Sequence, residues 1–398
     1  MSSLQQSRPL DGIRVLDLTA NVAGPLACQV LTDLGAQVIK VEPPGGEAAR
    51  RITATARGAE HVTPYFSPNN RGKLSVELAL GSTDGAAALT DMIRNADVIV
   101  QGMRPGAMAR RGFGPDEVAA INPRCIYASL SAYGGGSELQ DRPGIDMMVQ
   151  AEAGCLSGQP KGRTPRLIPF QLVDSATGHV LAQAVLAALL HRERAGVVNR
   201  VDVSLYDVAC SLQANFLTLQ MNLPPKPAQA QEDSTKERRA VAVEPSGVYP
   251  TSDGDIVLAA YVPAHWSRLV GLIGSPELAA DNRFVDQAAR SVNAQALREV
   301  LTQALAARGA DEWVELFDKA GLMAARINSW ADVIDSDIFA DRHLRVSAEQ
   351  DGRRVDVLRT PARYSSFSTT TETRIPARAE HSSLLADRTD AARVRSTV

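Results

Sequence analysis

The chain has few cysteines, no excess of either charge and no long apolar run. Four cysteines occur among 398 residues, and no two of them have CxxC spacing. This pattern argues against a disulfide framework and gives no support to a zinc site. No stretch of eighteen consecutive apolar residues and no apolar amino-terminal region is present, so neither secretion nor a membrane span is expected. We therefore expect a reducing, cytoplasmic location.

Several other common sites are missing as well. Lys and Arg total 42 against 45 Asp and Glu, which leaves a net charge of -3 without long blocks of one sign. Nothing in this pattern indicates a nucleic-acid groove. The six histidines form no HxH or HExxH pattern, so no metal site is expected. Ser157 and Ser175 lack the GxSxG turn, which argues against the usual hydrolase nucleophile.

The sequence contains a strand–helix–strand pattern near the amino terminus. IRVLDL (13–18) is followed by the apolar helix pattern PLACQVLTDLGA and then by QVIKVE (37–42). A crossover of this kind pairs its strands in parallel. Further strands are predicted at 74–78, 98–102 and 125–131, with helical stretches between them. Residues 1–200 are therefore expected to form an α/β domain with a doubly wound, Rossmann-like parallel sheet.

The composition changes after a helix expected around 209–219. The stretch 220–245 is rich in proline and charge and poor in large apolar residues, which is typical of an exposed linker. Beyond it, a strand pair around SGVYPTSDGDIVLAA and three helical stretches predict a smaller α+β domain over 246–330. The final segment, 343–398, has few helix patterns, and we expect it to complete the first domain.

The first loop tests whether the leading domain binds a dinucleotide. A diphosphate needs the close backbone approach that GxGxxG provides, whereas TANVAGP (19–25) contains a single glycine. Dinucleotide binding is therefore disfavoured. Glu42, at the end of the second strand, is then expected to be a surface acid rather than a ribose ligand.

Basic residues gather near predicted strand ends. If these ends converge, they form a site for a polyanion such as a phosphorylated nucleotide. The alternative is a solvated rim of charge, and the residues alone do not decide between the two. The basic residues concerned are Lys40, Lys73, Arg104, Arg110 and Arg111.

Asp174 is the strongest candidate for chemistry. The apolar run 167–173 predicts a strand that ends where a long apolar helix begins, with Asp174 in the first helical turn. The positive end of a helix would keep such a carboxylate ionised and nucleophilic. The alternative is a helix cap, since Asp is among the favoured capping residues. His179 is five residues further on, a step that turns it away from Asp174, so a dyad is not expected.

Many segments, in order, resemble one family. They include PLDGIRVLDLT, AGPLACQVLTDLGAQVIKVEPPGG, NRGKLSVEL, ADVIVQGMRPGAMARRGFG, NPRCIYASLSAYG, PGIDMMVQAEAG and, above all, LVDSATGHVLAQAVLAALLHRERAG. Together they resemble the family III CoA-transferases, a group that includes formyl-CoA:oxalate and carnitine CoA-transferases and the related α-methylacyl-CoA racemases. The resemblance runs through most of the chain and reaches AEHSSLL near its end.

The resemblance implies an interlocked homodimer, in which each large domain is completed by its own carboxy terminus and is joined to a small domain by long linkers. It also implies that coenzyme A or acyl-CoA is a substrate, with a small carboxylic acid as partner and with no metal or permanently bound cofactor. The family's catalytic aspartate matches Asp174. The positions that match its CoA-binding residues are Val22, Ala23, Lys40, Lys73, Leu74, Met103, Ala107, Arg110 and Tyr133.

Three departures separate this chain from particular family members. Val22 stands where formyl-CoA transferase has a glutamine that shields intermediates, and AVAVEPSGVYP replaces that enzyme's glycine-rich loop. Racemases carry GHD, whereas this chain has Gly144-Ile145-Asp146. Because Ile145 cannot transfer a proton, racemisation by a His/Asp pair lacks one base.

Three functional hypotheses follow. The first is CoA transfer through an aspartyl anhydride and an aspartyl-CoA thioester at Asp174, with Gly134–Gly136 as candidate oxyanion donors. Succinyl-CoA is the suggested donor, its distal carboxylate meeting Lys161, Arg163 or Arg166 unless these form only an exposed basic loop. The second is an acyl-CoA racemase or epimerase that uses Asp174 as base. The third is a noncatalytic CoA-binding protein.

Overall fold

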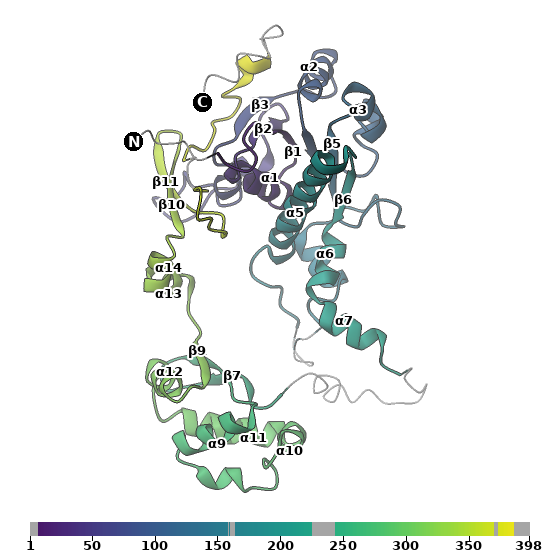
Figure 1. Ribbon diagram of the computed structural model, residues 1–398. Coiled ribbons are helices and arrows are strands. Elements are labelled where there is room, and N and C mark those ends of the chain that lie inside the picture. Colours follow the sequence, from purple (N-terminus) through teal and green to yellow (C-terminus); the bar gives the residue numbers. More distant parts are fainter. Residues whose placement is uncertain (1–6, 158, 160–163, 225–242, 370–372, 386–398) are drawn as a thin grey trace. The chain divides into compact units, whose positions relative to one another are not determined.

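The computed structural model describes residues 7–157, 159, 164–224, 243–369 and 373–385 (Figure 1). It divides the chain into two compact units. One unit combines Met1–Pro224 with His343–Val398, and the other is Pro225–Arg342. Each unit is described by itself below. Most of the predicted linker, residues 225–242, lies outside the described residues.

The first unit contains a six-stranded sheet in the order β3-β2-β1-β4-β5-β6, with every neighbouring pair parallel. Its apolar strands are buried because helices cover both faces. This confirms the predicted α/β class with a Rossmann-like parallel sheet. The strands are β1 (Arg14–Leu18), β2 (Gln37–Glu42), β3 (Leu74–Glu77), β4 (Val98–Gln101), β5 (Ile126–Ser131) and β6 (Arg200–Ser204).

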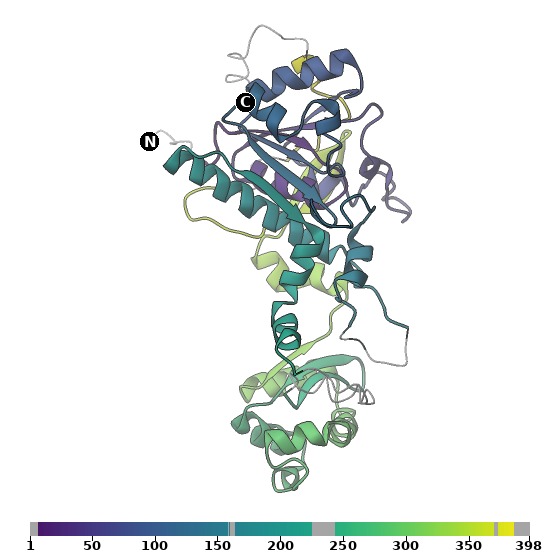
Figure 2. The ribbon, with the colours of Figure 1, turned by 90° about the vertical axis from the view of Figure 1, so that its right-hand side faces the viewer.

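Two groups of helices cover the sheet (Figure 2). On one face, α1 (Ala23–Asp33), α5 (Leu172–Ala195) and α6 (Leu205–Leu212) share a core with the strands. On the other face lie α2 (Thr83–Arg94) and α3 (Pro115–Ile121). The predicted helix 209–219 is interrupted, because α6 ends before Gln213 and α7 (Ala214–Met221) begins after it. The short α4 (Asp146–Glu152) packs against α5 and α6.

The predicted strand at 167–173 is wrong. No strand is assigned there, and α5 begins at Leu172. Pro165 and Pro169 lack the N–H that a ladder needs, and the N–H of Ile168 donates to Oε1 of Gln150 instead of to a neighbouring strand. By length and composition α5 could cross a membrane, but in this structure its buried residues join the core with α1 and the sheet.

The carboxy-terminal part of the first unit packs along the edge of β3. It begins with the hairpin of β10 (Arg345–Gln350) and β11 (Arg353–Leu358). Further on, the N–H of His381 donates to the carbonyl of Ser75, and the carbonyl of Arg374 accepts from Gly72. Short 3-10 helices in this unit are η1 (Ala48–Arg51), η2 (Ser67–Asn69), η3 (Ala109–Arg111) and η6 (Ser382–Leu385).

The second unit has its own α+β core. An antiparallel sheet in the order β7-β8-β9 packs against helices around buried Trp266, Trp313 and Phe317. Its elements are β7 (Ser246–Pro250), β8 (Asp255–Ala259), α9 (Pro263–Leu272), η5 (Pro276–Ala279), α10 (Gln287–Val292), α11 (Ala294–Leu305), α12 (Ala310–Lys319), β9 (Met323–Arg326), α13 (Trp330–Asp335) and α14 (Asp337–Asp341).

Candidate active site

Asp174 lies in the first turn of α5, and another aspartate caps that helix. Gln171 occupies the N-cap position without a capping side-chain hydrogen bond. Instead, Oδ2 of Asp146 accepts hydrogen bonds from the backbone N–H groups of Val173 and Asp174, at 2.8 and 3.0 Å. These are two of the donors that a helix leaves unpaired at its start. Asp174 is therefore not needed as the cap.

The carboxyl group of Asp174 is partly buried and accepts no hydrogen bond from the described residues. Burial, with a smaller contribution from the negative charge of Asp146, raises its pKa to about 7. The expectation that the helix end keeps this carboxylate ionised does not agree with the raised pKa. The physical reason is first the burial of the carboxyl group, and then the like charge of Asp146, which already accepts the helix N–H groups.

The helix that carries Asp174 packs against α1. Gly178 follows Asp174 by four residues, so the two lie on the same face of α5. A Cβ at Gly178 would lie 2.8 Å from the carbonyl oxygen of Ala23 and 2.9 Å from Cβ of Leu26. The face that carries Asp174 therefore packs directly on the start of α1, next to Val22.

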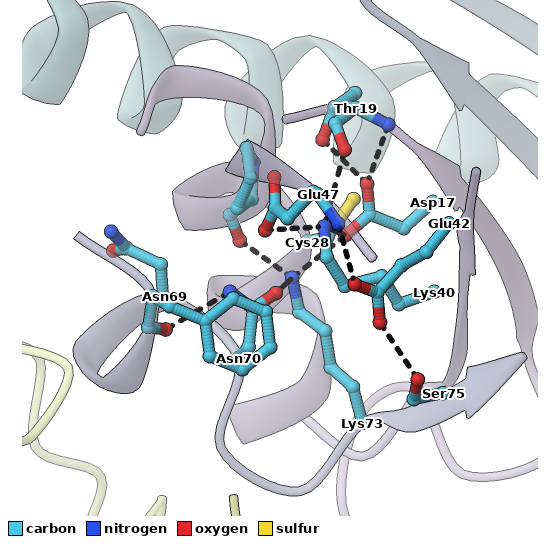
Figure 3. Close-up of polar contacts among 12 residues, drawn as sticks. Asp17, Thr19, Cys28, Lys40, Glu42, Glu47, Asn69, Asn70, Lys73 and Ser75 are labelled. Atoms are coloured by element: carbon cyan, nitrogen blue, oxygen red, sulfur yellow. Dashed lines mark hydrogen bonds and ion pairs between the residues drawn. The ribbon is translucent and has the colours of Figure 1, made fainter. Parts of the chain in front are cut away.

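A buried ionic cluster lies beneath that loop (Figure 3). Nζ of Lys73 is 2.8 Å from Oδ2 of Asp17, and Nζ of Lys40 is 3.2 Å from Oε1 of Glu47 and 3.8 Å from Asp17. Burial opposes the charge of Asp17, but the two lysines outweigh it and hold its pKa below the ordinary value. Burial likewise opposes the charge of Lys40, but Asp17 and Glu47 keep its pKa raised.

The cluster fixes the backbone of the first loop. Lys40 donates to the carbonyl of Thr19, Asp17 accepts from the N–H of Thr19, and Glu47 accepts from the N–H of Asn21. Asn21 has a φ of 67°, in the left-handed region that Asn tolerates. These bonds hold the segment that leads into Val22 and Ala23.

A pocket of about 260 Å³ lies in the first unit, where the carboxyl ends of β4, β5 and β6 contribute lining residues. In open α/β sheets, ligands bind outside these strand ends. Gln101 joins two of the strands through Ser129 Oγ and also accepts from the N–H of Met103. The lining includes Gln101, Met103, Pro105, Gly106, Ser129, Ser131, Gly135 and Asp202.

The sequence profile of CoA-transferase family III matches residues 10–382. The chain belongs to this family.

Relatives and solved structures agree with the assignment. The chain is 48% identical over 390 residues to a probable fatty acyl-CoA transferase of Mycobacterium tuberculosis, a match that covers 96% of this chain and 99% of that one. It is 34% identical over 342 residues to an acetyl-CoA:oxalate CoA-transferase of Acetobacter aceti, covering 85% and 86%. The orthorhombic crystal structure of Rv3272 from M. tuberculosis matches with a TM-score of 0.86 and 47% identity over 96% of this chain and all of that chain.

A CAIB/BAIF family protein from Brucella suis matches with a TM-score of 0.82 and 30% identity, over 96% of this chain and 100% of that chain. This family III CoA-transferase is therefore an enzyme of acyl-CoA and carboxylic acids. The hypothesis of a noncatalytic CoA-binding protein is no longer needed.

The residues that the resemblance assigned to CoA fall into two groups. Val22 and Ala23 begin α1 above the ionic cluster, and Leu74 begins β3. Met103 lines the pocket, Ala107 lies four residues further on, and a guanidinium nitrogen of Arg110 would be 3.0 Å from a Cβ on pocket-lining Gly106. A Cβ on Gly102 would be 3.7 Å from Cβ of Thr19, so the two groups adjoin. Tyr133 is buried just after β5.

Two of these residues, Lys40 and Lys73, do not form the polyanion-binding rim that was expected. Lys40 lies inside β2 rather than at its end, and the ammonium groups of Lys40 and Lys73 are fully enclosed with their acids. In the CoA-transferase these charges are neutralised within the fold and are not exposed to a phosphate. Glu42 is also not a surface acid, because it is buried and paired with Arg50 at 2.7 Å.

Two of the three N–H groups in the glycine stretch predicted to bind an oxyanion already donate to side chains of the protein. The N–H of Gly134 donates to Oγ of Ser131, and the N–H of Gly136 donates to Oε1 of Gln140. Gly135 is the member of the three whose N–H has no acceptor among the described residues, and it lines the pocket. Lys161 and Arg163 lie outside the described residues.

Sequence reasoning missed the roles of Asp146 and Asp17. Asp146 follows Ile145 in the motif that was compared with GHD, so its position was available, but its bonds to α5 depend on tertiary packing. Asp17 lies in β1 and could be read only as a strand residue. Among the described residues, no group of three or more His, Cys, Asp or Glu could hold a metal ion.

Proposed function

We propose that this CoA-transferase works through covalent intermediates on Asp174. A carboxylate oxygen of Asp174 attacks the thioester carbonyl of the donor acyl-CoA, the C–S bond breaks, and the CoA thiolate leaves a mixed anhydride behind. The thiolate then attacks the Asp174 carbonyl of that anhydride. The donor acid departs as a carboxylate, and an aspartyl-CoA thioester remains.

The second half repeats these steps in reverse. The acceptor carboxylate attacks the aspartyl thioester, the thiolate leaves, and an anhydride between Asp174 and the acceptor forms. Attack of the thiolate on the acceptor carbonyl then releases the new acyl-CoA and restores the carboxylate of Asp174. The scheme exchanges one activated carbonyl for another and needs neither a metal nor a bound cofactor.

One observation carries this proposal: the carboxyl group of Asp174 accepts no hydrogen bond from the described residues and lies at a helix start that another residue already caps. Its pKa of about 7 makes the ionised form a stronger nucleophile than an ordinary aspartate, while leaving about half of the groups ionised at neutral pH. In the racemase alternative, Asp174 would act as a base on the α-carbon of an acyl-CoA, and the same pKa would suit that role. However, Ile145 offers no second proton-transfer group beside it.

For the substrates, we propose succinyl-CoA as donor and a carboxylic acid with an apolar body as acceptor. Relatives named succinyl-CoA:mesaconate and succinate–glutarate CoA-transferase support the donor. Arg166, which is exposed and forms no ion pair with the described residues, is a candidate partner for the distal carboxylate of succinate. Exposed Ile145 and Phe170, close in sequence to Asp146 and Asp174, support an apolar acceptor, as does the fatty acyl-CoA transferase relative.

We place the nucleotide end of CoA at the pocket beside Met103. Arg104 and Arg110 are exposed there and form no ion pair with the described residues, so both are available to phosphate groups. Lys40 and Lys73 would then act indirectly, by holding the backbone of the loop before Val22 and Ala23.

Assembly and location complete the proposal. Large apolar side chains are exposed on α7 and α13–α14, among them Met221 at 76%, Trp330 at 73% and Ile338 at 71%. Burial of such side chains favours association, and the interlocked homodimer is the assembly that we propose. A cytoplasmic location agrees with four cysteines that are all thiols in this structure.

The experiment is a transfer assay with purified enzyme. Succinyl-CoA and acetyl-CoA are offered as donors, and oxalate, glutarate and octanoate as acceptors, and the acyl-CoA products are separated and identified. We expect succinyl-CoA to give octanoyl-CoA in preference to the CoA thioesters of oxalate and glutarate, because octanoate has the apolar body. Asp174→Asn is expected to lower kcat by at least about a thousandfold, because no nucleophile remains.

Arg110→Ala separates binding from chemistry in the same assay. We expect it to raise KM for the acyl-CoA much more than it lowers kcat, since the guanidinium meets a part of the substrate that does not react. Full activity of Asp174→Asn would remove the covalent mechanism. Deuterium incorporation at the α-carbon without any CoA exchange would favour the racemase alternative instead.

A further inference from the structure

Asp146 joins two helices at the catalytic candidate. Its side chain lies at the start of α4 and is 7% exposed. Oδ2 accepts the N–H groups of Val173 and Asp174 at the start of α5, and Oδ1 accepts from Nε2 of Gln150. All three contacts are N–H donors, which an ionised carboxylate can accept without a proton of its own. The first turn of α5 is therefore tied to α4 through one buried side chain.

Gln150 extends this connection to the segment that precedes α5. While its Nε2 donates to Asp146, its Oε1 accepts the N–H of Ile168 at 3.0 Å. The chain from Ile168 to Asp174 is thus held at both ends by neighbouring residues of α4. Among the described residues this segment pairs with no strand, so these side-chain bonds, together with the one from Nε2 of Gln171 to the hydroxyl of Tyr65, hold the start of α5 and with it Asp174.

Asp146 is also the charge that acts on Asp174. The elements packed against α5 are α1, α4, α6, β5 and β6. Of the charged and titratable groups on these elements and on α5 itself, Asp146 is the one that shifts the pKa of Asp174, in addition to burial. The other groups are Cys28, Asp33, Tyr127, Glu152, His179, His191, Arg192, Glu193, Arg194, Arg200, Asp202, Tyr206, Asp207 and Cys210.

We propose that Asp146 is a positioning residue of the reaction: its carboxylate fixes the backbone of Asp174 at the start of α5 and places a negative charge near that side chain. The inference rests on the proposed function, because it assumes that the carboxylate of Asp174 is the reacting group. Asp146 does not itself touch the substrate. It makes Asp174 more basic and holds it in one place, and both effects favour nucleophilic attack.

Three variants separate charge from position. Asp146→Asn removes the charge but keeps an oxygen that can accept the N–H groups of α5. Gln150→Leu keeps the charge at Asp146 and removes two hydrogen bonds, the one to Oδ1 of Asp146 and the one from the N–H of Ile168. Asp253→Asn is the matched control, because Oδ1 of Asp253 accepts the N–H of Ala310 at 2.7 Å at the start of α12, in the other unit.

The first measurement is the pH dependence of kcat/KM for one donor and one acceptor. In Asp146→Asn the acid limb is expected to move down by about one pH unit, which raises the ratio of activity at pH 6 to that at pH 8 about fivefold. Gln150→Leu and Asp253→Asn are expected to show no downward shift. Asp146→Ala is expected to lose at least about tenfold in kcat relative to Asp146→Asn, because the N–H groups of α5 then lose their acceptor.

The second measurement does not depend on activity. The unfolding midpoint of the enzyme with Asp174 is compared with that of the Asp174→Asn variant across pH 4–9. The comparison is made once with Asp146 present and once in the Asp146→Asn background. The difference reports the pKa of Asp174 in each background, and that pKa is expected to fall when Asp146 is neutralised. An unchanged pKa in this cycle, with an unchanged acid limb, would overturn the proposal.

The two measurements also keep this inference apart from the proposed function. If the stability cycle shows the coupling but Asp174→Asn retains full transfer activity, the electrostatic link stands and the covalent mechanism fails. If Asp174→Asn is inactive and no coupling appears, the mechanism survives and the role of Asp146 is refuted.

Discussion

Asp146 and Asp174 lie at the same helix start in opposite surroundings. Asp146 is buried and accepts three N–H groups, whereas the carboxyl of Asp174 accepts none from the described residues. Asp146, on α4, caps the start of α5, so the carboxyl group of Asp174 is not needed for capping. Burial and the charge of Asp146 make that carboxyl group costly to ionise. Such unfavourable arrangements are typical of functional sites, where stability is given up for reactivity.

Asp174→Asn is therefore expected to stabilise the fold at neutral and alkaline pH. The pKa is about 7 in the folded protein and 3.8 in the reference state, so the folded state binds the proton more tightly. The folded wild type loses stability as the pH rises from about 4 to about 7, and the uncharged Asn does not. The variant should gain roughly 4 kcal/mol relative to wild type at pH 8 and almost nothing at pH 4, as measured by urea unfolding. A variant less stable than wild type at pH 8 would show that the carboxylate is structural.

At the residue scale, a catalytic candidate could be predicted where it belongs to a sequence motif. The roles of residues that depend on burial could not be predicted. Asp174 could be named from LVDSATGHV and its family resemblance. Lys40 and Lys73 could be seen only as basic residues near strands, because nothing in a linear pattern shows that Asp17 and Glu47 neutralise them inside the fold. Glu42 was misplaced for the same reason, since its partner Arg50 lies beyond a turn.

The elements that carry the site are joined by a close contact of two helices. Gly178 lets α5 approach the first turn of α1, so that Asp174 and Val22 are placed by the same contact. The βαβ unit at 13–42 could be predicted, because apolar periodicity and a glycine exit mark it clearly. The strand expected at 167–173 could not be refuted from its apolar composition alone, and β6 was missed because RVDVS is short and half polar.

Gly178→Ala tests this contact. The added methyl group would meet the carbonyl of Ala23 at 2.8 Å, so the helices must separate, at a cost of about 1–3 kcal/mol. We expect a lower free energy of unfolding in urea and a kcat/KM reduced beyond what the loss of folded protein explains. Gly271→Ala is the control, because this helical glycine of α9 has nothing within 4 Å of an added Cβ. It should be neutral or stabilising by up to about 1 kcal/mol. Wild-type behaviour of Gly178→Ala would show that α1 and α5 need not approach this closely.

At the scale of the whole molecule, the chain forms two compact units, each with its own apolar core. The first unit has an apolar cluster on each face of its sheet, and the tryptophan-containing core of the second unit is separate from both. Alternating strand and helix patterns followed by a change of composition were enough to predict this α/β and α+β combination. How two chains would assemble is not contained in such patterns, because association depends on which apolar side chains the fold leaves exposed.

The proposed interlocked homodimer is tested by subunit exchange. Sedimentation is expected to give twice the mass of one chain at micromolar concentration, through burial of side chains such as Trp330 and Met221. When tagged and untagged dimers are mixed under native conditions, no mixed dimers should form, since threaded chains separate only on unfolding. Mixed dimers should form after denaturation and refolding together. A monomer, or rapid exchange without denaturant, would contradict the threaded assembly.

The most direct test of the account is to capture the acylated aspartate. The enzyme is incubated with succinyl-CoA, quenched with hydroxylamine, digested and analysed by mass spectrometry, with Asp174→Asn treated in parallel. The account predicts an aspartyl hydroxamate at Asp174 in the wild type that requires the acyl-CoA and is missing from the variant. An active enzyme that yields no adduct at Asp174, or yields one at another residue, would contradict it.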